Sequence, residues 1–245
     1  MNLSLETWPR NVFICIPSYQ ACEALALLLP GLLDTVPAAQ VLVVDDGSTD
    51  TTGELCSRID IRHVRNAENR GKGAALTAGF TILLEKGAEA VITMDADGQH
   101  AVADLGLFVD EFRLHPGTGI CIGRRQFAKS GMPLSRIVSN TLTSRILSIL
   151  CGVPVPDSQC GYRLYSARLL RGITITCTRY TMESEVILKA ARLGFPVRSV
   201  PVQTLYLRGQ SHISHLTDTL RWIRAVLGIW LRLRLYGISE PRRGP

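Results

Sequence analysis

Two aspartates follow an apolar run near the middle of the chain, and this pattern is the one best suited to chemistry. Residues 91–94, Val-Ile-Thr-Met, lead into Asp95, Ala96, Asp97 and Gly98. Two like charges this close together are unfavourable unless a proton or a cation neutralises one of them. A hard divalent cation that takes oxygen ligands from carboxylates and phosphates meets this need. The pattern therefore predicts chemistry on a nucleotide or another phosphorylated compound.

A second acidic turn follows an earlier apolar run, because residues 41–44 lead into Asp45, Asp46 and Gly47. Each acidic turn alone is also explained as a turn that begins the next helix, since Asp and Gly suit turn conformations. Two such turns after two strands of one parallel sheet would face the same crevice, where open α/β sheets bind ligands. Together they favour a nucleotide site, with the first pair at the base or ribose and the second at the diphosphate.

The spacing of apolar residues predicts the elements that must position these carboxylates. Short apolar runs indicate strands, and longer runs with helical periodicity indicate helices. Strands are expected at 12–16, 41–44, 61–64, 91–94, 119–122 and 197–201, and helices at 22–35, 73–84, 134–150 and 183–193. This alternation predicts an α/β fold with a mostly parallel sheet and helices on both faces. The helix at 134–150 is expected to place Arg136 and Arg145 on its polar side.

The composition fits one large α/β domain with a short appendage, since the chain has 245 residues and 46% of them are hydrophobic. The 7 cysteines lack metal-ligand spacing and are odd in number, which predicts reduced thiols in the cytosol. The N-terminal residues lack the basic and apolar segments of a signal peptide. The net charge is +6, but no interleaved basic and aromatic pattern indicates nucleic-acid binding.

Several segments, in a fixed order along the chain, give the sequence a specific resemblance. They are Ile16-Pro17-Ser18-Tyr19, Val43-Val44-Asp45-Asp46-Gly47-Ser48-Thr49-Asp50, Asn69-Arg70-Gly71-Lys72-Gly73 and Met94-Asp95-Ala96-Asp97-Gly98-Gln99-His100. Over about residues 11–215, the chain resembles family 2 glycosyltransferases with the GT-A fold. The segments Asp157-Ser158-Gln159-Cys160-Gly161-Tyr162-Arg163-Leu164 and Arg208-Gly209-Gln210-Ser211-His212 narrow the resemblance to the dolichyl- and polyprenyl-phosphate mannosyl- and glucosyltransferases.

The resemblance implies a role for each matching residue. The residues implied to bind substrate are Pro17, Tyr19, Glu23, Val43, Asp45, Asp95, Ala96, Arg125, Arg136, Arg208 and His212. Asp95, Asp97 and Gln99 are implied to hold Mg²⁺ or Mn²⁺ on the diphosphate of a UDP- or GDP-sugar. Arg125 and Arg208 are implied to offer their guanidinium groups to phosphates. Lys72 either adds positive potential near the crevice or is a solvated surface lysine.

Two positions depart from the family pattern. Family members commonly have Asn-Glu after the tyrosine, where this chain has Gln20 and Ala21, so Glu23 is the expected substitute acid. Many polyprenyl-phosphate enzymes have a lysine where this chain has His212, which bears on the acceptor rather than on the fold.

Asp157 is the expected catalytic residue on the acceptor side, and Asp97 is the one on the donor side. A hydroxyl acceptor needs a general base. A phosphate monoester, with a second pKa of about 6, is already largely anionic at neutral pH, and Asp157 would then mainly position it. The implied reaction inverts the anomeric centre, and its acceptor is a polyprenyl phosphate or, alternatively, a hydroxyl of a glycan.

Residues 219–245 are expected to form a basic amphipathic tail after a glycosyltransferase domain at 1–218. Between Leu220 and Tyr236 arginines interrupt an apolar sequence, and the longest apolar run is too short to span a bilayer. At about 100° per residue, one helix face contains Arg221, Arg224, Gly228 and Arg232. Such a helix suits the headgroup region at the cytoplasmic face of a membrane. Packing on the domain and a dimer contact are alternative explanations, and the sequence predicts no oligomeric state.

Two other functions share parts of this pattern. Asp95-Ala96-Asp97-Gly98 superficially resembles the nucleophile loop of haloacid-dehalogenase phosphatases, but that loop belongs on the first core strand and here it follows two earlier strands. A non-catalytic protein that binds sugar nucleotides is the other alternative, although the metal-binding carboxylates are present.

Overall fold

A mixed sheet forms the centre of the fold. The computed structural model describes residues 4–126, 132–204 and 215–237. Within these residues 7 strands lie in the order β3-β2-β1-β4-β6-β5-β7. They are β1 (Val12–Ser18), β2 (Val41–Asp45), β3 (Arg62–Arg65), β4 (Ala90–Thr93), β5 (Ile120–Arg125), β6 (Arg163–Ser166) and β7 (Val197–Val202). Every pairing is parallel except those of β6, which lies antiparallel to β4 and β5.

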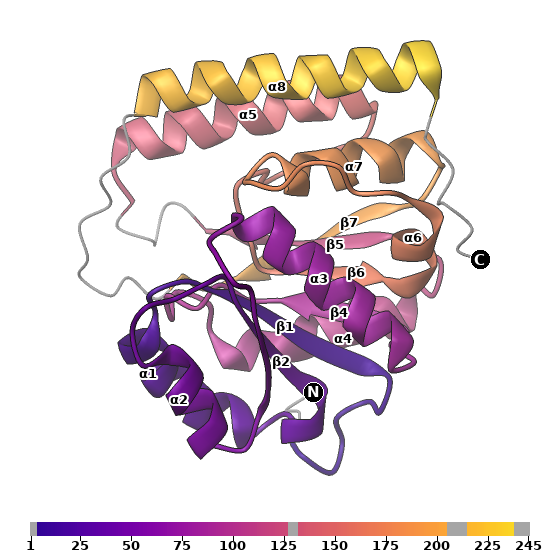
Figure 1. The fold of residues 1–245 in the computed structure, drawn as a ribbon. Coiled ribbons are helices and arrows are strands. Elements are labelled where there is room, and N and C mark those ends of the chain that lie inside the picture. The colour runs from indigo at the N-terminus through magenta and orange to yellow at the C-terminus, as the bar shows by residue number, and fades with distance from the viewer. Residues whose placement is uncertain (1–3, 127–131, 205–214, 238–245) are drawn as a thin grey trace.

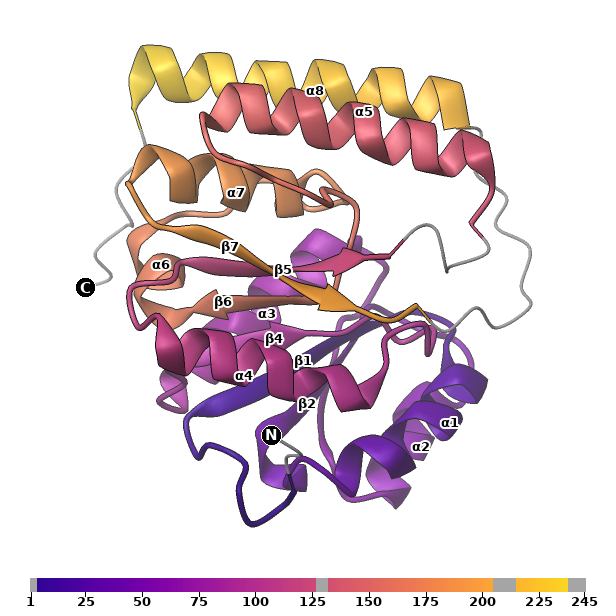
Figure 2. The ribbon, with the colours of Figure 1, turned by 180° about the vertical axis from the view of Figure 1, so that it is seen from behind.

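Helices cover both faces of the sheet. Along β1, Ile14 and Ile16 face one side while Phe13 and Cys15 face the other, because successive side chains of a strand alternate. The first side packs against α1 (Cys22–Leu33), α2 (Thr52–Arg58) and α4 (Leu105–Leu114), and the second against α3 (Lys72–Glu85), α6 (Ala167–Gly172) and α7 (Met182–Arg192). Figures 1 and 2 show these helices from opposite sides. The predicted α/β fold with a mostly parallel sheet is confirmed.

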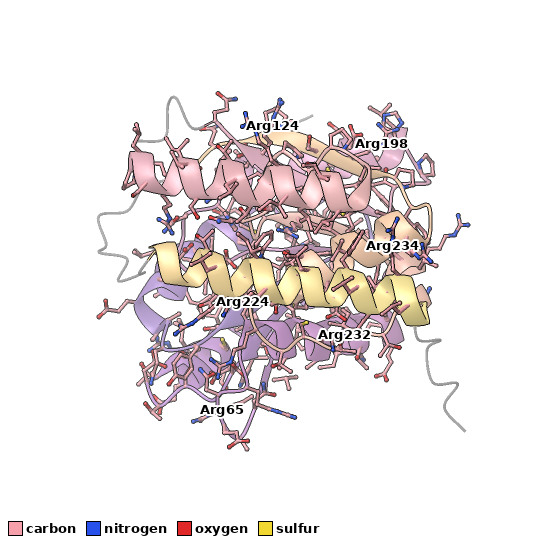
Figure 3. The ribbon with its side chains drawn as sticks, turned by 90° about the horizontal axis from the view of Figure 1, so that it is seen from above. Arg65, Arg124, Arg198, Arg224, Arg232 and Arg234 are labelled. Atoms are coloured by element: carbon pink, nitrogen blue, oxygen red, sulfur yellow. The ribbon has the colours of Figure 1, made fainter. Side chains whose placement is uncertain are left out.

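Two long helices form a further layer outside α7, as Figures 1 and 3 show. They are α5 (Leu134–Cys151) and α8 (His215–Tyr236). Near their first turns the Ser139 and Thr219 hydroxyls lie 2.9 Å apart. Near their last turns the Trp230 indole donates to the Leu150 carbonyl at 3.1 Å. The two helices therefore lie side by side and run in the same direction.

The α8 helix contributes to the core of the domain. Val226, Ile229 and Leu233 are buried in the same apolar cluster as side chains of α3 and α7. The Trp222 indole also donates to the Ser184 hydroxyl of α7, at 3.1 Å. The domain boundary predicted between residues 218 and 219 therefore lies inside a helix that packs on the rest of the chain.

The α5 helix is amphipathic in an unexpected sense, because its polar residues face the protein. Asn140 and Thr143 are buried, whereas Leu134 and Ile149 are each 79% exposed. The two polar side chains hydrogen-bond to the loop that precedes β6. The outer face, on which Arg145 was expected among polar residues, instead combines this arginine with exposed apolar side chains.

The seven cysteines are free thiols, as the sequence predicts. None of the described helices is both long enough and apolar enough to cross a membrane.

Candidate functional site

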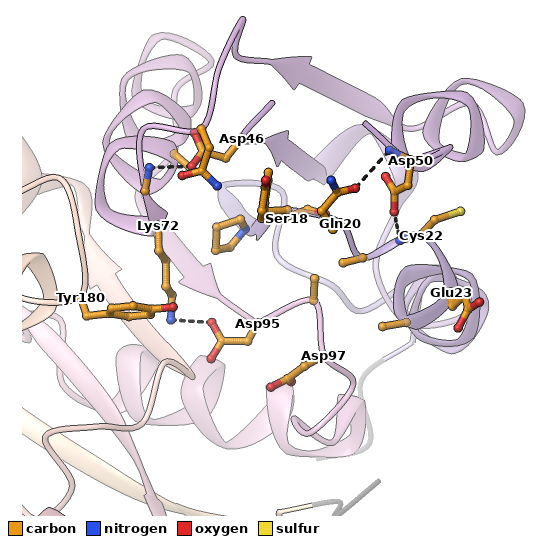
Figure 4. A pocket seen from close by; sticks show the side chains of 18 of the residues that line it. Ser18, Gln20, Cys22, Glu23, Asp46, Asp50, Lys72, Asp95, Asp97 and Tyr180 are labelled. Atoms are coloured by element: carbon orange, nitrogen blue, oxygen red, sulfur yellow. Dashed lines mark hydrogen bonds and ion pairs between the residues drawn. The ribbon is translucent and has the colours of Figure 1, made fainter. Parts of the chain in front are cut away.

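A cavity of about 960 Å³ opens at the carboxyl ends of β1, β2 and β4, and Figure 4 shows many of its side chains. Its walls come from separate stretches of the sequence, within residues 17–24, 46–51, 69–75, 95–97 and 179–180. The ionisable side chains among its lining residues include the carboxylates of Glu23, Asp46, Asp50, Asp95 and Asp97 and the cations of Lys72 and Arg179. A cavity with this excess of carboxylates favours a ligand that brings a cation with it.

Lys72 joins two carboxylates from distant segments at the side of this cavity. Its Nζ lies 2.5 Å from Asp95 Oδ1 and 3.0 Å from Glu183 Oε1. The Lys72 side chain is 18% exposed and that of Glu183 is 8% exposed, so salt screens these pairs weakly. In Figure 4 the Lys72 side chain extends to Asp95, with Tyr180 beside them. Lys72 is thus a partner of Asp95, and the alternative of a solvated surface lysine is excluded.

The ion pairs shift the protonation of both partners. Burial would raise the pKa of Asp95, but the Lys72 ammonium overrides this effect and lowers the pKa to about 2. Burial would lower the pKa of Lys72, but Asp95 and Glu183 raise it above its usual value. Burial lowers the pKa of His100, whose Nδ1 accepts the Asp95 backbone N–H at 3.1 Å. At neutral pH Lys72 is charged, Asp95 is ionised and His100 is neutral.

The loop before β6 passes over the Lys72–Asp95 pair at Gly161. A Cβ atom on Gly161 would lie 2.5 Å from Asp95 Oδ2 and 2.6 Å from Lys72 Nζ, so a side chain here requires the pair to move. The guanidinium of Arg163, which is 0% exposed, donates to two carbonyls of the same loop at 2.6 and 2.8 Å. It also donates to the Glu183 carbonyl at 3.1 Å. Arg163 therefore holds the loop and the start of α7 in one arrangement around the ion pair.

We expect Gly161→Ala to reduce catalytic activity by about 100-fold or more, because the methyl group displaces the Lys72–Asp95 pair from its position beside the cavity. The free energy of unfolding should fall by about 1–3 kcal/mol, as at other overpacked sites. Steady-state kinetics and thermal unfolding measure the two effects. Gly172→Ala is the matched control, since its Cβ would meet only an ordinary contact at 3.9 Å. Equal activity of the two variants would contradict the tight contact at Gly161.

Asp97 is the carboxylate of its acidic turn that is open to the cavity. Its side chain is exposed, and Oδ1 accepts the Gln99 backbone N–H at 3.0 Å. Among the described residues, no three His, Cys, Asp or Glu side chains cluster closely enough to hold a metal ion by themselves. Asp97 nevertheless fits an ion such as Mg²⁺, which takes one or two carboxylates and completes its shell with phosphates and water. The metal roles of Asp95 and of Gln99, which is not among the cavity-lining residues, remain predictions.

In the first acidic turn, Asp46 rather than Asp45 is among the cavity-lining residues. Asp46 Oδ2 accepts the Gly71 backbone N–H at 2.6 Å, which ties the turn to the start of α3. Asp45 is 1% exposed, and its Oδ1 accepts the Ser48 backbone N–H at 2.8 Å. Val43 is buried in the core on one face of the sheet. The nucleotide contacts implied for Asp45 and Val43 remain predictions.

The end of β1, the turn after it and the start of α1 form another wall of the cavity, through Pro17, Tyr19 and Glu23 respectively. All three are among the implied substrate residues. Gln20 has a φ of 51°, and its side-chain oxygen accepts the Asp50 backbone N–H at 3.1 Å. Asp50 in turn accepts the first backbone N–H of α1, at 3.1 Å. Tyr19 is 50% exposed, so its ring is open to stack on a base or sugar.

Asp157 and Arg125 form a pair outside the cavity lining. Arg125 Nε donates a hydrogen bond to Asp157 Oδ2 at 2.8 Å, and one terminal guanidinium nitrogen donates to Oδ1 at 2.9 Å. The Asn140 amide also donates to Oδ1 at 2.9 Å, and Asp157 is 0% exposed. A buried carboxylate with both oxygens engaged in this way is suited to position its partners rather than to accept a proton. Its catalytic role remains a prediction.

Of the other residues implied to bind substrate, some line the cavity and some do not. Ala96 lines the cavity beside Asp95 and Asp97. Arg136 lies in the first turn of α5 and is not among the lining residues. Arg208 and His212 lie outside the residues that the structure describes.

Several residues of the site had no role in the sequence interpretation. They are Gly161, Arg163, Arg179, Tyr180 and Glu183. Arg163 lies within a segment that carries the family resemblance, but its burial could not be inferred from a charged residue at the start of a short strand. Glu183 reaches Lys72, and Arg179 reaches the cavity, because the segment that leads into α7 packs against the start of α3. No sequence pattern indicated this contact.

Fold and site together define a class of protein. A mostly parallel α/β sheet flanked by helices, with an acidic cavity at the carboxyl ends of its strands, is a GT-A-type arrangement. Residues 13–174 match the family described as Glycosyl transferase family 2. The chain belongs to this family, and it is a glycosyltransferase. The phosphatase and non-catalytic alternatives are therefore excluded.

Known proteins agree with this assignment. The chain is 31% identical to the undecaprenyl-phosphate mannosyltransferase of Micrococcus luteus, over 92% of this chain and 99% of that protein. It is 31% identical to the polyprenol monophosphomannose synthase of Mycolicibacterium smegmatis, over 79% of this chain and 77% of that protein. Glucosyl-3-phosphoglycerate synthase from Mycobacterium tuberculosis, in complex with Mn²⁺, UDP-glucose and phosphoglyceric acid, superposes with a TM-score of 0.70 at 19% identity, covering 96% of this chain and 82% of that one. This last likeness supports the fold.

Proposed function

We propose that the chain transfers a hexose from a UDP- or GDP-sugar to a polyprenyl phosphate. The observation that most supports the donor is the acidic cavity, in which Asp97 is open while Asp95 is held by Lys72. The relatives from Micrococcus luteus and Mycolicibacterium smegmatis, whose names specify undecaprenyl phosphate and polyprenol monophosphomannose, support the acceptor.

In this reaction the bond between the anomeric carbon and the donor phosphate oxygen breaks, and the nucleoside diphosphate leaves with the electron pair. An oxygen of the acceptor phosphate forms the new bond on the opposite face, which inverts the anomeric centre. Mg²⁺ or Mn²⁺, when bound, supplies Lewis-acid stabilisation of the leaving diphosphate. Asp97 would hold this ion, and Lys72 keeps Asp95 ionised and fixed so that it can accept hydrogen bonds from the nucleotide sugar.

The hydrogen bonds that Asp157 already accepts support a phosphate acceptor over a hydroxyl acceptor. A hydroxyl needs a general base, but both oxygens of Asp157 already accept hydrogen bonds from Arg125. A phosphate monoester needs no such base, because its second pKa of about 6 leaves it anionic at neutral pH. The glycan acceptor is therefore the weaker alternative.

The test is a transfer assay with purified protein, Mn²⁺, polyprenyl phosphate and a panel of UDP- and GDP-sugars. We expect a lipid-linked hexose to form from one of these donors. Nucleotide release without a lipid-linked product would contradict the acceptor assignment. The absence of both products with every donor would contradict the donor assignment as well.

We further propose that the outer faces of α5 and α8 contact the membrane that contains such an acceptor. Their exposed apolar residues are Leu134, Val138, Leu142, Ile149, Leu220, Leu227, Leu231 and Leu235. Residues 134–151 and 219–236 contain no acidic side chain. Arg145 is exposed on α5. Arg224 and Arg232, labelled in Figure 3, are exposed on α8. A surface that combines apolar and basic residues fits an anionic lipid headgroup region.

Removal of two exposed leucines should weaken vesicle binding by about tenfold or more, because each buries apolar area in the lipid interface. The double variant Leu134→Ser/Leu235→Ser changes residues that are 79% and 72% exposed. Leu27→Ser/Leu114→Ser on α1 and α4 is the matched control, with residues 76% and 73% exposed. Co-sedimentation with vesicles that contain anionic lipid compares the two proteins.

Equal binding by the two double variants would contradict the membrane proposal. Deletion of residues 219–245 is a less specific test, because it removes Val226, Ile229 and Leu233 from the core.

A further inference from the structure

The two cations that line the cavity differ in their partners. Lys72 is held by Asp95 and Glu183 at 2.5 and 3.0 Å. Arg179 is exposed and lines the cavity, and among the described residues none forms an ion pair or a hydrogen bond with its guanidinium. Arginine presents a planar set of donors that matches the oxygens of a phosphate. Arg179 is therefore the cation of this cavity that is open to an anionic ligand.

The backbone of Arg179 is held close to the start of α3. The Ala74 backbone N–H donates to the Thr178 carbonyl at 2.9 Å. A Cβ on Gly71 would lie 2.8 Å from the Thr178 carbonyl oxygen, and one on Gly73 would lie 2.7 Å from the Arg179 carbonyl oxygen. The two glycines thus permit a contact that side chains would prevent. This contact fixes the backbone of Arg179 beside the cavity, and with it the position from which the side chain extends.

Arg125, the phosphate ligand implied by the family resemblance, has a different environment. Its Nε and one terminal nitrogen donate to Asp157, and its side chain is 13% exposed. It is not among the residues that line the cavity. Since these donors are already engaged, Arg125 is less available to the donor diphosphate than Arg179 is.

We propose that Arg179 binds the diphosphate of the nucleotide sugar and stabilises the nucleoside diphosphate as it leaves. The inference rests on the proposed function of the cavity as the nucleotide-sugar site. When the anomeric carbon–oxygen bond breaks, its electron pair remains on the diphosphate oxygen. The guanidinium then interacts with a more negative group than in the ground state, so Arg179 contributes to both binding and rate.

The test compares Arg179→Ala, Arg179→Lys and Arg192→Ala by calorimetry with UDP and GDP in the presence of Mn²⁺. We expect Arg179→Ala to bind the preferred diphosphate about 10- to 100-fold more weakly, the range for a hydrogen bond to a charged group. Arg179→Lys should retain part of the affinity because it keeps the charge. Arg192→Ala removes an exposed arginine in the last turn of α7, outside the cavity lining, and should bind like the unmodified protein.

Weaker diphosphate binding by Arg179→Ala has two possible causes, a lost contact with the phosphates or a displaced loop. Uridine and guanosine distinguish them, because these nucleosides lack the diphosphate. We expect Arg179→Ala and the unmodified protein to bind the preferred nucleoside equally. Unchanged diphosphate affinity in Arg179→Ala would overturn the inference and leave the proposed function intact. If Arg179→Ala binds nucleoside and diphosphate more weakly by the same factor, the inference is also overturned, because Arg179 then only maintains the shape of its loop. If the unmodified protein binds neither UDP nor GDP, the proposed function and this inference both fail.

Discussion

The Asp97→Ala protein is expected to lose transfer activity by about 1,000-fold or more while it keeps its fold. Asp97 is an exposed carboxylate of the acidic cavity. A divalent ion held there, as proposed above, would stabilise the leaving diphosphate by several kcal/mol, which corresponds to a rate factor of this size. The substitution removes the turn hydrogen bond from the Gln99 backbone N–H, which costs about 1 kcal/mol. Transfer rates and thermal unfolding, measured on one preparation, separate the two effects.

Two further variants make this experiment more specific, one by removing only the charge and one as a control at another carboxylate. Asp97→Asn keeps the size of the side chain and its turn acceptor but removes the charge, so it should be about as inactive as Asp97→Ala. Asp34→Ala removes an exposed carboxylate at the end of α1, outside the cavity lining, and should remain active. Full activity in Asp97→Ala would refute the metal site, and full activity in Asp97→Asn would show that the charge is not required.

Replacement of Lys72 by methionine should both destabilise and inactivate the enzyme. The change leaves Asp95 and Glu183, whose side chains are 28% and 8% exposed, without the cation that they share. Removal of one partner from a buried ion pair costs about 3–5 kcal/mol, and the partial exposure of Asp95 favours the lower end. Because Asp95 also loses its fixed position, transfer should fall by about 100-fold or more. Denaturant unfolding and transfer kinetics near neutral pH measure both losses.

The stability loss of Lys72→Met should also depend on pH. Burial raises the pKa of Asp95, but in the unmodified protein Lys72 lowers it from 3.8 to about 2. A carboxyl group whose pKa is lowered on folding adds stability above its unfolded-state pKa and loses this contribution as the pH falls. The difference in the free energy of unfolding between the two proteins should therefore be largest near neutral pH and narrow as the pH falls towards about 2, where Asp95 becomes protonated in both proteins.

Lys86→Met is the control for this pH dependence, since it removes an exposed lysine at the end of the same helix. Its difference from the unmodified protein should be small over the whole pH range. A Lys72→Met difference that stays constant down to about pH 3 would contradict the ion pair as the source of the stability.

The strands of the first half of the fold could be predicted because β1, β2 and β4 are short apolar runs bounded by turn residues. Most strand ends in this half differ from the prediction by one residue, and the largest difference is in β1, which continues through Pro17 to Ser18 instead of ending before the proline. The reason lies in the ladder: β4 pairs with β1 only as far as Cys15, whereas β2 pairs with it to Ser18. Pro17 thus lies where β1 has one neighbour, and there a missing backbone N–H is tolerated.

β6 could not be predicted because Arg163 interrupts its apolar pattern. This arginine is fully buried, and carbonyls of the preceding loop and of Glu183 compensate its charge. The inward polar face of α5 was hidden for a similar reason. Asn140 is buried because it donates to Asp157, a partner that the periodicity of α5 alone does not reveal.

The carboxylates on the donor side of the site could be predicted more readily than the cations that lie beside them. Asp95 and Asp97 directly follow a strand in the sequence, so the strand end places them at the cavity. Lys72 is the first residue of α3 and Arg179 lies just before α7, and these two segments meet only in the folded chain. The charge balance of the cavity is therefore a property of the tertiary structure, and the sequence alone left Lys72 undecided.

The most direct test of the nucleotide-sugar site is a binding titration of the unmodified protein with UDP and with GDP, in Mn²⁺ and in EDTA. The cavity offers carboxylates rather than a complete metal site, so ion and diphosphate should bind together. We expect one nucleotide to bind at least about tenfold more tightly with Mn²⁺ than in EDTA, and Asp97→Ala to remove that difference. Equal affinity of the unmodified protein in Mn²⁺ and in EDTA would contradict the joint site of metal and diphosphate.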